Sequence, residues 1–578
     1  MKGIKEFKPL LKLVKEEKTK LIIASIIIFA SGLCEIFTGY LNGAAVEAIT
    51  KLDIRTSLMY LFIYFALEIT MDGAILFYGN MLLLKVESSL TRKLGFLTYK
   101  KVLNLPSVAF EKTSSGEIIN RITSDADTLS FTFKKLLTLI SSLVASLIII
   151  IYIFINSYII GIEIIILVLI ILLILKKYSP ILKQTHKERK QNQDKFTSLT
   201  TETIRGIREV KTLGIRKNVI KEASNIIKEI YASSAYEIDI YRKFDTYTGI
   251  TKSMLEVGVL ITCIILLYYK KISLTFFVSM TYYIYRYTWL ITNINDLVQS
   301  YQKVNVSLER VNEILENRLY KDEDYGNIKL KNVNGIIEFK NVSFSYPNEA
   351  KTLDNFSLKI EPNKKIAIVG ASGQGKSTLF NLITRIFDVT SGEILIDGIN
   401  VKDLTEESLR QNISLIRQEP FIFNRTIKEN FKLVDRNIKL KEIREYCKMS
   451  YIDDYIMTLP KKYNTILGES GINLSGGQKQ RLSIARSLCK KSKIILFDEA
   501  TSALDNKSQE YIKKTIDSLV KDHTVMIVAH RLSTIVDADI IHVVKKGKVV
   551  DSGTHDELLE KSEIYRSLYK TETLNSNW

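Results

Sequence analysis

Long apolar runs alternate with charged segments through the first half of the chain. Residues 136–155 contain no charged side chain, and residues 158–175 contain only Glu163. About 20 apolar residues of helix are enough to cross a hydrocarbon core ~30 Å thick. Only Asn156 and Ser157 separate the two runs, so the pattern predicts a helical hairpin that spans a membrane.

The same pattern occurs at four more places. Residues 21–46 contain only Glu35 as a charged side chain, and residues 57–84 contain Glu68 and Asp72. Two shorter runs flank Lys270-Lys271 and become full spans when each is extended through one charged residue. Six membrane helices are therefore predicted, at about 21–46, 57–84, 136–155, 158–176, 248–269 and 272–295.

Basic residues predict the orientation of these spans. Lysines crowd residues 1–20 and the even-numbered connections, and the odd-numbered connections contain few. Because basic loops stay on the cytoplasmic side, both termini should be cytoplasmic. Residues 1–18 have apolar positions on one face and predict an interfacial helix. The connections Lys85–Lys135 and Lys176–Asp245 read as cytoplasmic helices, with a bend or stop expected at Pro180.

Composition narrows the class of protein. Of 578 residues, 46% are hydrophobic, which excludes a disordered chain. Four scattered cysteines exclude a disulfide scaffold. The net charge of +18 is largely explained by basic segments beside a membrane, so no nucleic-acid partner is expected. High Lys, Ile and Asn content favours a bacterial plasma membrane.

A second domain follows the helical one. The predicted membrane domain covers residues 19–316, and the polar stretch 317–336 reads as a linker. Residues 337–578 alternate short β-branched strands with helices, which is typical of an α/β domain. The fold class is thus a six-helix transmembrane domain fused to an α/β P-loop nucleotide-binding domain.

The α/β domain opens with a phosphate-binding loop. The buried-strand pattern of residues 365–369 runs directly into G-x-x-x-x-G-K-S. Backbone N–H groups of such a loop wrap phosphates, its lysine reaches the β- and γ-phosphates, and its serine ligates Mg²⁺. The predicted phosphate-binding residues are Gly370, Ala371, Ser372, Gly373, Gln374, Gly375, Lys376, Ser377 and Thr378.

A second buried strand, residues 494–498, ends in two carboxylates. A carboxylate beside a phosphate loop can hold Mg²⁺ directly or through water. We therefore assign Asp498 to the metal and its neighbour Glu499 to the general base that polarises an attacking water.

The segment Leu474-Ser475-Gly476-Gly477-Gln478 resembles the signature motif of ATP-binding cassette (ABC) transporters. Other family motifs follow in order along the chain. By this resemblance, Tyr346 stacks on adenine, Gln418 is the Q-loop glutamine that contacts Mg²⁺ or water, and His530 is the switch histidine at the γ-phosphate. Residues 467–471 resemble a segment typical of exporters, and Asp505 matches the D-loop.

The resemblance covers the whole chain and has the half-transporter layout of exporters with the type IV membrane fold. It implies ATP and Mg²⁺ as ligands, and a dimer in which Ser475, Gly476, Gly477, Gln478 and Asp505 of one chain act on the ATP of the other. Intact Glu499 and an intact signature favour a homodimer over a heterodimer with one degenerate site.

Charged residues in the predicted spans are candidate substrate contacts, because charges in a bilayer are costly. Glu68, Glu256 and Arg286 are the residues proposed, together with the aromatic side chains of residues 276–289. An acidic, aromatic cavity would suit an amphipathic cation. The alternative is that Arg286 pairs with one acid and that the aromatic residues simply pack.

The sequence predicts ATP-driven export of a small amphipathic substrate. A lipid flippase or a peptide exporter would share every motif. A siderophore importer can use the same layout, and an ATP-gated channel or sensor would need only nucleotide binding.

Overall fold

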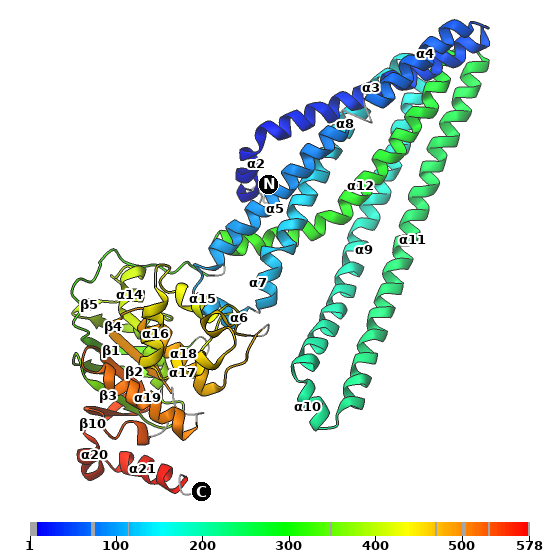
Figure 1. Ribbon diagram of the computed structural model, residues 1–578. Coiled ribbons are helices and arrows are strands. Elements are labelled where there is room, and N and C mark those ends of the chain that lie inside the picture. The colour runs from blue at the N-terminus through cyan, green and yellow to red at the C-terminus, as the bar shows by residue number, and fades with distance from the viewer. Residues whose placement is uncertain are drawn as a thin grey trace. The chain divides into compact units, whose positions relative to one another are not determined.

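The computed structural model describes residues 8–70, 76–113, 115–318, 320–346, 350–468, 471–499, 505–529 and 532–575. The chain divides into two compact units. One consists of Met1–Leu105 with Thr113–Lys321, and the other of Pro106–Lys112 with Asp322–Trp578. The first unit is built from helices, and the second contains the β-sheets (Figure 1).

Long helices make up the first unit. They are α2 (Lys8–Glu16), α3 (Lys18–Thr50), α4 (Ile54–Glu68), α5 (Phe77–Val102), α7 (Ser115–Ile122), α8 (Ser124–Asn156), α9 (Tyr158–Arg205), α10 (Ile207–Thr212), α11 (Arg216–Tyr268) and α12 (Leu274–Leu315). Over the described ranges, four helical segments are long and apolar enough to cross a membrane: Lys18–Thr50, Gly116–Asn156, Tyr158–Arg205 and Arg216–Tyr268.

These four segments contain the predicted spans 21–46, 136–155 and 158–176 and all but the last residue of the span 248–269. The span predicted at 57–84 falls on α4 and α5, and residues 71–75 between them lie outside the described part of the chain. The span predicted at 272–295 falls within α12, which does not reach the same apolar threshold. These two spans stay predictions.

α9 continues as a helix beyond the predicted membrane span, as the helical pattern of residues 176–245 indicated. Pro180 lies inside the helix, where we had expected a bend or stop. Figure 1 shows α9 and α11 side by side, and Tyr178 of α9 packs in a buried cluster with Ile240 and Phe244 of α11. This packing stabilises the helix on both sides of the proline, so the missing N–H does not end it.

Small residues bring α3 and α12 together. A Cβ atom on Gly43 would lie 2.2 Å from the backbone oxygen of Thr275, and one on Gly39 would lie 2.6 Å from the Tyr283 ring. The Ser279 hydroxyl donates to the backbone oxygen of Gly39 over 3.0 Å. Close backbone approach through small residues is a common way for membrane helices to associate.

The N-terminal helix α2 contacts protein through part of its apolar face. Leu13 and Val14 pack against a cluster that contains Leu83, Val86 and Leu90 of α5. We had expected this segment to lie at the membrane interface. The structure gives at least these two side chains a protein neighbour.

The second unit contains two sheets and their helices. The four-stranded sheet has the order β2-β1-β4-β5, and the six-stranded sheet has the order β10-β9-β3-β8-β7-β6. Their strands are β1 (Ile337–Ser345), β2 (Lys351–Ile360), β3 (Lys365–Val369), β4 (Ser391–Ile396), β5 (Ile399–Asn400), β6 (Ile413–Ile416), β7 (Ile494–Asp498), β8 (Thr524–Val528), β9 (Ile540–Lys545) and β10 (Lys548–Gly553). The helices are α6 (Val108–Lys112), α13 (Lys376–Ile383), α14 (Glu406–Asn412), α15 (Ile427–Lys432), α16 (Leu440–Met449), α17 (Asp453–Thr458), η2 (Lys462–Asn464), α18 (Gly476–Leu488), α19 (Asn506–Leu519), η3 (Leu532–Thr534), α20 (His555–Lys561) and α21 (Glu563–Asn575).

The larger sheet places the candidate site at one edge. β3, β6, β7, β8 and β9 are parallel to one another, so their carboxyl ends meet at the same edge. Ligands bind to open α/β sheets at this edge. The loop after β3 and the carboxylates at the end of β7 are thereby brought together.

Most of the segment that we expected to be a linker belongs to the second unit. The N–H of Ile328 donates to the backbone oxygen of Asp403 over 2.9 Å, and the N–H of Leu330 donates to the Ser408 hydroxyl over 2.9 Å. The compact unit begins at Asp322, although the strand pattern suggested residue 337. Irregular backbone that is hydrogen-bonded to α14 and its flanking turn leaves no periodic signal in the sequence.

Candidate nucleotide site

Three glycines shape the loop between β3 and α13. Gly370, Gly373 and Gly375 have φ angles of 157°, 77° and 86°, a region that side chains with a Cβ rarely adopt. A Cβ atom on Gly370 would also lie 2.3 Å from the backbone oxygen of Val544 on β9. The loop therefore wraps tightly and delivers its N–H groups to the start of α13, where anions bind.

The loop's lysine and serine lie where the motif predicts. Lys376 is buried, and its ammonium donates to the backbone oxygens of Gly370 and Ala371 at 2.7 and 2.9 Å. The Ser377 hydroxyl donates to Asp498 over 2.8 Å. Ser377 and Asp498 are 121 positions apart in the sequence, and their oxygen atoms meet beside the loop.

Burial disfavours the charged forms of both Asp498 and Lys376. It raises the pKa of the Asp498 carboxyl, and the hydrogen bond from Ser377 and the charges of Arg417 and Lys376 act against that rise. Burial also lowers the pKa of Lys376, and the charges of Glu499 and Asp498 counteract it. A ligand with both a cation and phosphate groups would satisfy both side chains.

Glu499 has a strained backbone. Its φ angle is 48°, in the left-handed region, and its N–H donates to the backbone oxygen of Val528 over 2.9 Å. Asp498 pairs with Val528 in the parallel register of β7 and β8, so the chain turns sharply directly after the metal-type carboxylate. A non-glycine residue held in this conformation is typical of functional sites.

Tyr346 lies beside the same loop. Its hydroxyl is 3.2 Å from the Thr378 hydroxyl, and its ring contacts Phe344 and Phe387 edge-on, with centroids 4.9 and 5.2 Å away. The side chain is half-buried. The position agrees with a ring beside bound nucleotide, and residues 347–349 lie outside the described residues.

One contact of the loop has no counterpart among the predicted roles. The Gln374 side-chain oxygen accepts the N–H of Lys546, in the turn between β9 and β10. Gly547, the next residue, has a φ angle of 70° and packs against Thr352 of β2. The motif marks Gln374 as a loop residue, but nothing in the sequence indicates a partner 172 residues away.

The signature residues begin α18 and face α19. Ser475 caps α18, since its hydroxyl accepts the N–H of Gln478 while the Gln478 side chain accepts the N–H of Ser475. A Cβ atom on Gly477 would lie 2.5 Å from the Ser508 hydroxyl. The Asp505 carboxylate caps α19 by accepting the N–H of Ser508 over 3.1 Å. Hydrogen bonds from the Ser508 hydroxyl and then from this N–H lower the pKa of Asp505.

The structure therefore forms two groups from the predicted residues. Lys376, Ser377 and Asp498 meet at the phosphate loop, whereas the signature residues gather with Asp505 at the ends of α18 and α19. Gln418 is exposed on the loop after β6. His530, residues 502–504 and residues 469–470 lie outside the described part of the chain.

Two of the predicted substrate residues, Glu68 and Glu256, lie on different helices. Glu68 ends α4, and one of its carboxylate oxygens is buried with no hydrogen-bond partner among the described residues. Glu256 is exposed on α11, and the Arg286 side chain is not described. Phe276 and Tyr283 are buried in a core cluster, so these two aromatic side chains pack, as the alternative interpretation held.

Comparisons with known proteins bear on both units. A family model described as ABC transporter transmembrane region matches residues 21–295, and one described as ABC transporter matches residues 353–502. The structure of a bacterial Atm1-family ABC exporter with ATP bound has a TM-score of 0.83 and 23% identity, and the match covers 96% of this chain and 98% of that chain. At this identity the likeness establishes the fold.

Two curated relatives are bacterial. "Putative multidrug export ATP-binding/permease protein YgaD" of Bacillus subtilis (strain 168) is 43% identical over 270 residues, which are 46% of this chain and 47% of the relative. A protein of the same description from Staphylococcus aureus (strain NCTC 8325 / PS 47) is 48% identical over 260 residues, or 44% of this chain and 45% of the relative. The match spans about half the length of these relatives.

The two family models together cover most of the chain. Apart from residues 106–112, the first lies within the helical unit, and the second lies within the α/β unit. The α/β unit is an ATP-binding cassette, and the helical unit is a membrane domain of the same family. The chain belongs to the ABC transporter family, with one transmembrane region and one cassette in a single polypeptide.

Proposed function

We propose that this protein uses ATP hydrolysis to export a small amphipathic substrate across a bacterial plasma membrane. The observation that carries the proposal is the Ser377–Asp498 contact at a glycine-shaped phosphate loop, in the same polypeptide as four helices that can cross a membrane. The relatives named for multidrug export support the direction of transport. Both termini would be cytoplasmic.

The residues of the site divide the work of hydrolysis. Backbone N–H groups of residues 370–378 and the Lys376 ammonium bind the phosphates, and Tyr346 lies where adenine would stack. Ser377, Asp498 and Gln418 supply oxygen ligands of the kind that Mg²⁺ prefers, and the ion when bound neutralises phosphate charge. Glu499 orients and polarises the attacking water, and His530 contacts the γ-phosphate.

Two chains are needed in this proposal. Gly477 packs against α19. Ser475 and Gly476 are exposed at the start of α18, where they can close over the ATP of a second chain. A homodimer would have two equivalent sites. Closure of the cassettes would favour an outward-open membrane domain, and hydrolysis would reverse it, because a ligand shifts a conformational equilibrium only through differential binding.

Uptake into inside-out membrane vesicles tests the proposal. Wild-type protein should accumulate a fluorescent lipophilic cation when Mg-ATP is added, and Glu499→Gln should bind ATP but neither hydrolyse it nor accumulate the dye. Near-wild-type hydrolysis by Glu499→Gln would remove Glu499 from its role. Hydrolysis without accumulation in the wild type would overturn the dye as substrate and point to lipid or peptide.

A further inference from the structure

A groove lies between α9 and α11 of the helical unit. Its volume is about 840 Å³, within the range of sites that bind drug-sized molecules. Ile159 to Leu167 mark its extent along α9, a rise of about 12 Å. The lining residues are Ile159, Ile162, Glu163, Ile166, Leu167, Ile250, Ser253, Met254, Val257, Gly258 and Ile261.

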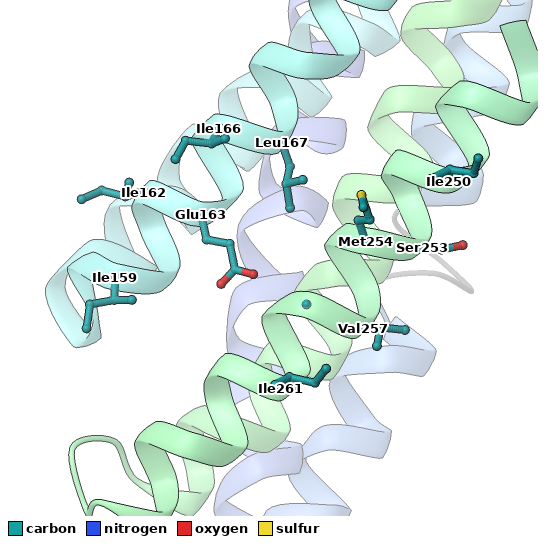
Figure 2. Close-up of a pocket in the computed structure, with 11 residues that line it drawn as sticks. Ile159, Ile162, Glu163, Ile166, Leu167, Ile250, Ser253, Met254, Val257 and Ile261 are labelled. Atoms are coloured by element: carbon teal, nitrogen blue, oxygen red, sulfur yellow. The ribbon is translucent and has the colours of Figure 1, made fainter.

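The groove is aliphatic with a single charge. Glu163 is the only ionisable residue of the lining, and no aromatic residue belongs to it. Figure 2 shows the Glu163 side chain reaching from α9 towards α11, among isoleucine, leucine, valine and methionine side chains. Within the described part of the chain, no basic side chain forms an ion pair with Glu163.

Gly258 makes room for the carboxylate. A Cβ atom at this position would lie 3.0 Å from a carboxylate oxygen of Glu163. The acid therefore occupies a notch in α11, where a larger residue would push it aside. Glu163 and Gly258 both line the groove, so the carboxylate lies in it against the backbone of α11.

We infer that the groove binds a lipophilic monocation, with Glu163 as the residue that selects for positive charge. The inference rests on the proposed export function and names the substrate class. A charge in a bilayer is costly unless it is paired, and in a low-dielectric environment a single cation gains strongly from one carboxylate. Aliphatic side chains on both helices would cover the apolar body of the ligand, and one negative charge would disfavour anions.

Binding of tetraphenylphosphonium and of tetraphenylborate to the full chain in nanodiscs tests the inference. The two ions have the same shape and opposite charge, and empty nanodiscs correct for partition into lipid. Without ATP, the wild type should bind the cation and not the anion. Glu163→Gln should weaken cation binding at least about tenfold, the size expected for loss of a close charge pair.

Three further variants separate charge from folding. Glu163→Asp keeps the charge and should retain most of the affinity for the cation. Gly258→Ala keeps Glu163 but fills the notch, and should weaken cation binding. Asp245→Asn removes an exposed acid of α11 outside the groove, and should leave cation affinity within about twofold of wild type.

The outcomes are distinct. Equal binding of both ions would show an apolar surface for lipid or for a second chain, and would overturn the inference. So would unchanged cation affinity in Glu163→Gln, or equal losses in Glu163→Gln and Asp245→Asn. Because binding is measured without ATP, failure here leaves ATP-driven accumulation in vesicles untouched, and failure of that accumulation leaves the binding result standing.

Discussion

Two opposing effects act on the pKa of Asp498. Burial raises its pKa, and the Ser377 hydrogen bond and the positive charges of Arg417 and Lys376 lower it. Arg417 is exposed, on the loop after β6, and it acts on Asp498 only through its charge. The ionised carboxylate that can hold Mg²⁺ thus depends partly on a residue outside the phosphate loop.

Arg417→Gln should therefore move the acidic limb of the ATPase pH profile to higher pH. With the charge removed, the pKa of Asp498 rises further, so the carboxyl becomes protonated at a higher pH as the solution is acidified. The measurement is steady-state ATPase activity against pH at saturating Mg-ATP. Arg436→Gln, another exposed arginine, is the control, and coincident profiles for all three proteins would refute this account.

The motifs predicted the residues of this site but not their electrostatics. G-x-x-x-x-G-K-S names Lys376 and Ser377 because the chemistry of phosphate binding requires those side chains at that spacing. Arg417 and the Gln374–Lys546 contact escaped prediction, because both depend on which strands lie beside each other in the sheet. A single sequence without strand order has no signal for such contacts.

The start of α18 shows how a single glycine sets the distance between two helices. Ala usually stabilises a helix relative to Gly by up to about 1 kcal/mol. At Gly477 the added methyl would lie 2.5 Å from the Ser508 hydroxyl of α19, and overpacking of this kind costs about 1–3 kcal/mol. The steric cost should exceed the gain in helix propensity.

Gly477→Ala should thus lower the thermal stability of the cassette, measured by the unfolding temperature of the purified full chain. Ser508→Ala removes the clashing oxygen but also the 2.8 Å hydrogen bond from Arg481. The double variant should therefore lose less stability than the sum of the two single variants. Strictly additive losses would mean that Gly477 and Ser508 do not crowd each other.

Glu17 attaches the N-terminal helix to α5. Its carboxylate accepts hydrogen bonds from Lys20 over 2.8 Å, Lys93 over 2.9 Å and Ser89 over 2.7 Å. Chiefly because of Lys20 and then Lys93, the pKa of Glu17 falls from 4.5 to about 2. A lowered pKa stabilises the folded state above the unfolded value, so this contribution is complete at neutral pH and is lost as the pH falls from about 4.5 to about 2.

At neutral pH, Glu17→Gln should increase amide hydrogen exchange in α2, because the neutral side chain binds Lys93 and Lys20 less strongly. Glu16→Gln is the matched control, since Glu16 is more exposed and contacts Lys93 alone among these partners. Equal exchange in the two variants would contradict a special role for Glu17. The apolar pattern of residues 1–18 predicted an amphipathic helix, but the sequence could not tell lipid from α5 as its neighbour.

At the scale of the whole molecule, hydropathy separated the membrane domain from the cassette correctly, since the two family models divide the chain in the same way. Hydropathy did not predict that α9 continues through Pro180, nor where the cassette begins. α9 passes through Pro180 because α11 packs beside it, and residues 322–336 join the cassette through backbone hydrogen bonds. Both depend on tertiary contacts that periodicity does not encode.

In the proposed dimer each nucleotide site contains residues of two chains. Two variants that are inactive alone should therefore regain activity when they pair. Lys376→Ala destroys the phosphate loop, and Ser475→Arg destroys the signature, so each homodimer should be inactive. In a mixed dimer, the phosphate loop of the Ser475→Arg chain would face the signature of the Lys376→Ala chain. One composite site would be intact, and the purified mixed dimer should have about half of the wild-type ATPase rate if sites act independently.

Coexpression of the two variants with different affinity tags, followed by tandem purification, provides the mixed dimer for ATPase assays. The control pairs Ser475→Arg with the double variant Lys376→Ala/Ser475→Arg, in which no combination of chains forms an intact site. Recovery in the first pair and none in the control would place each nucleotide between two chains. An inactive first pair that dimerises normally would instead require two intact sites per dimer or a nucleotide site contained within one chain. A mixed dimer of wild type with the double variant decides between these explanations, because a site contained within one chain would leave it about half of the wild-type rate and a composite site would leave it none.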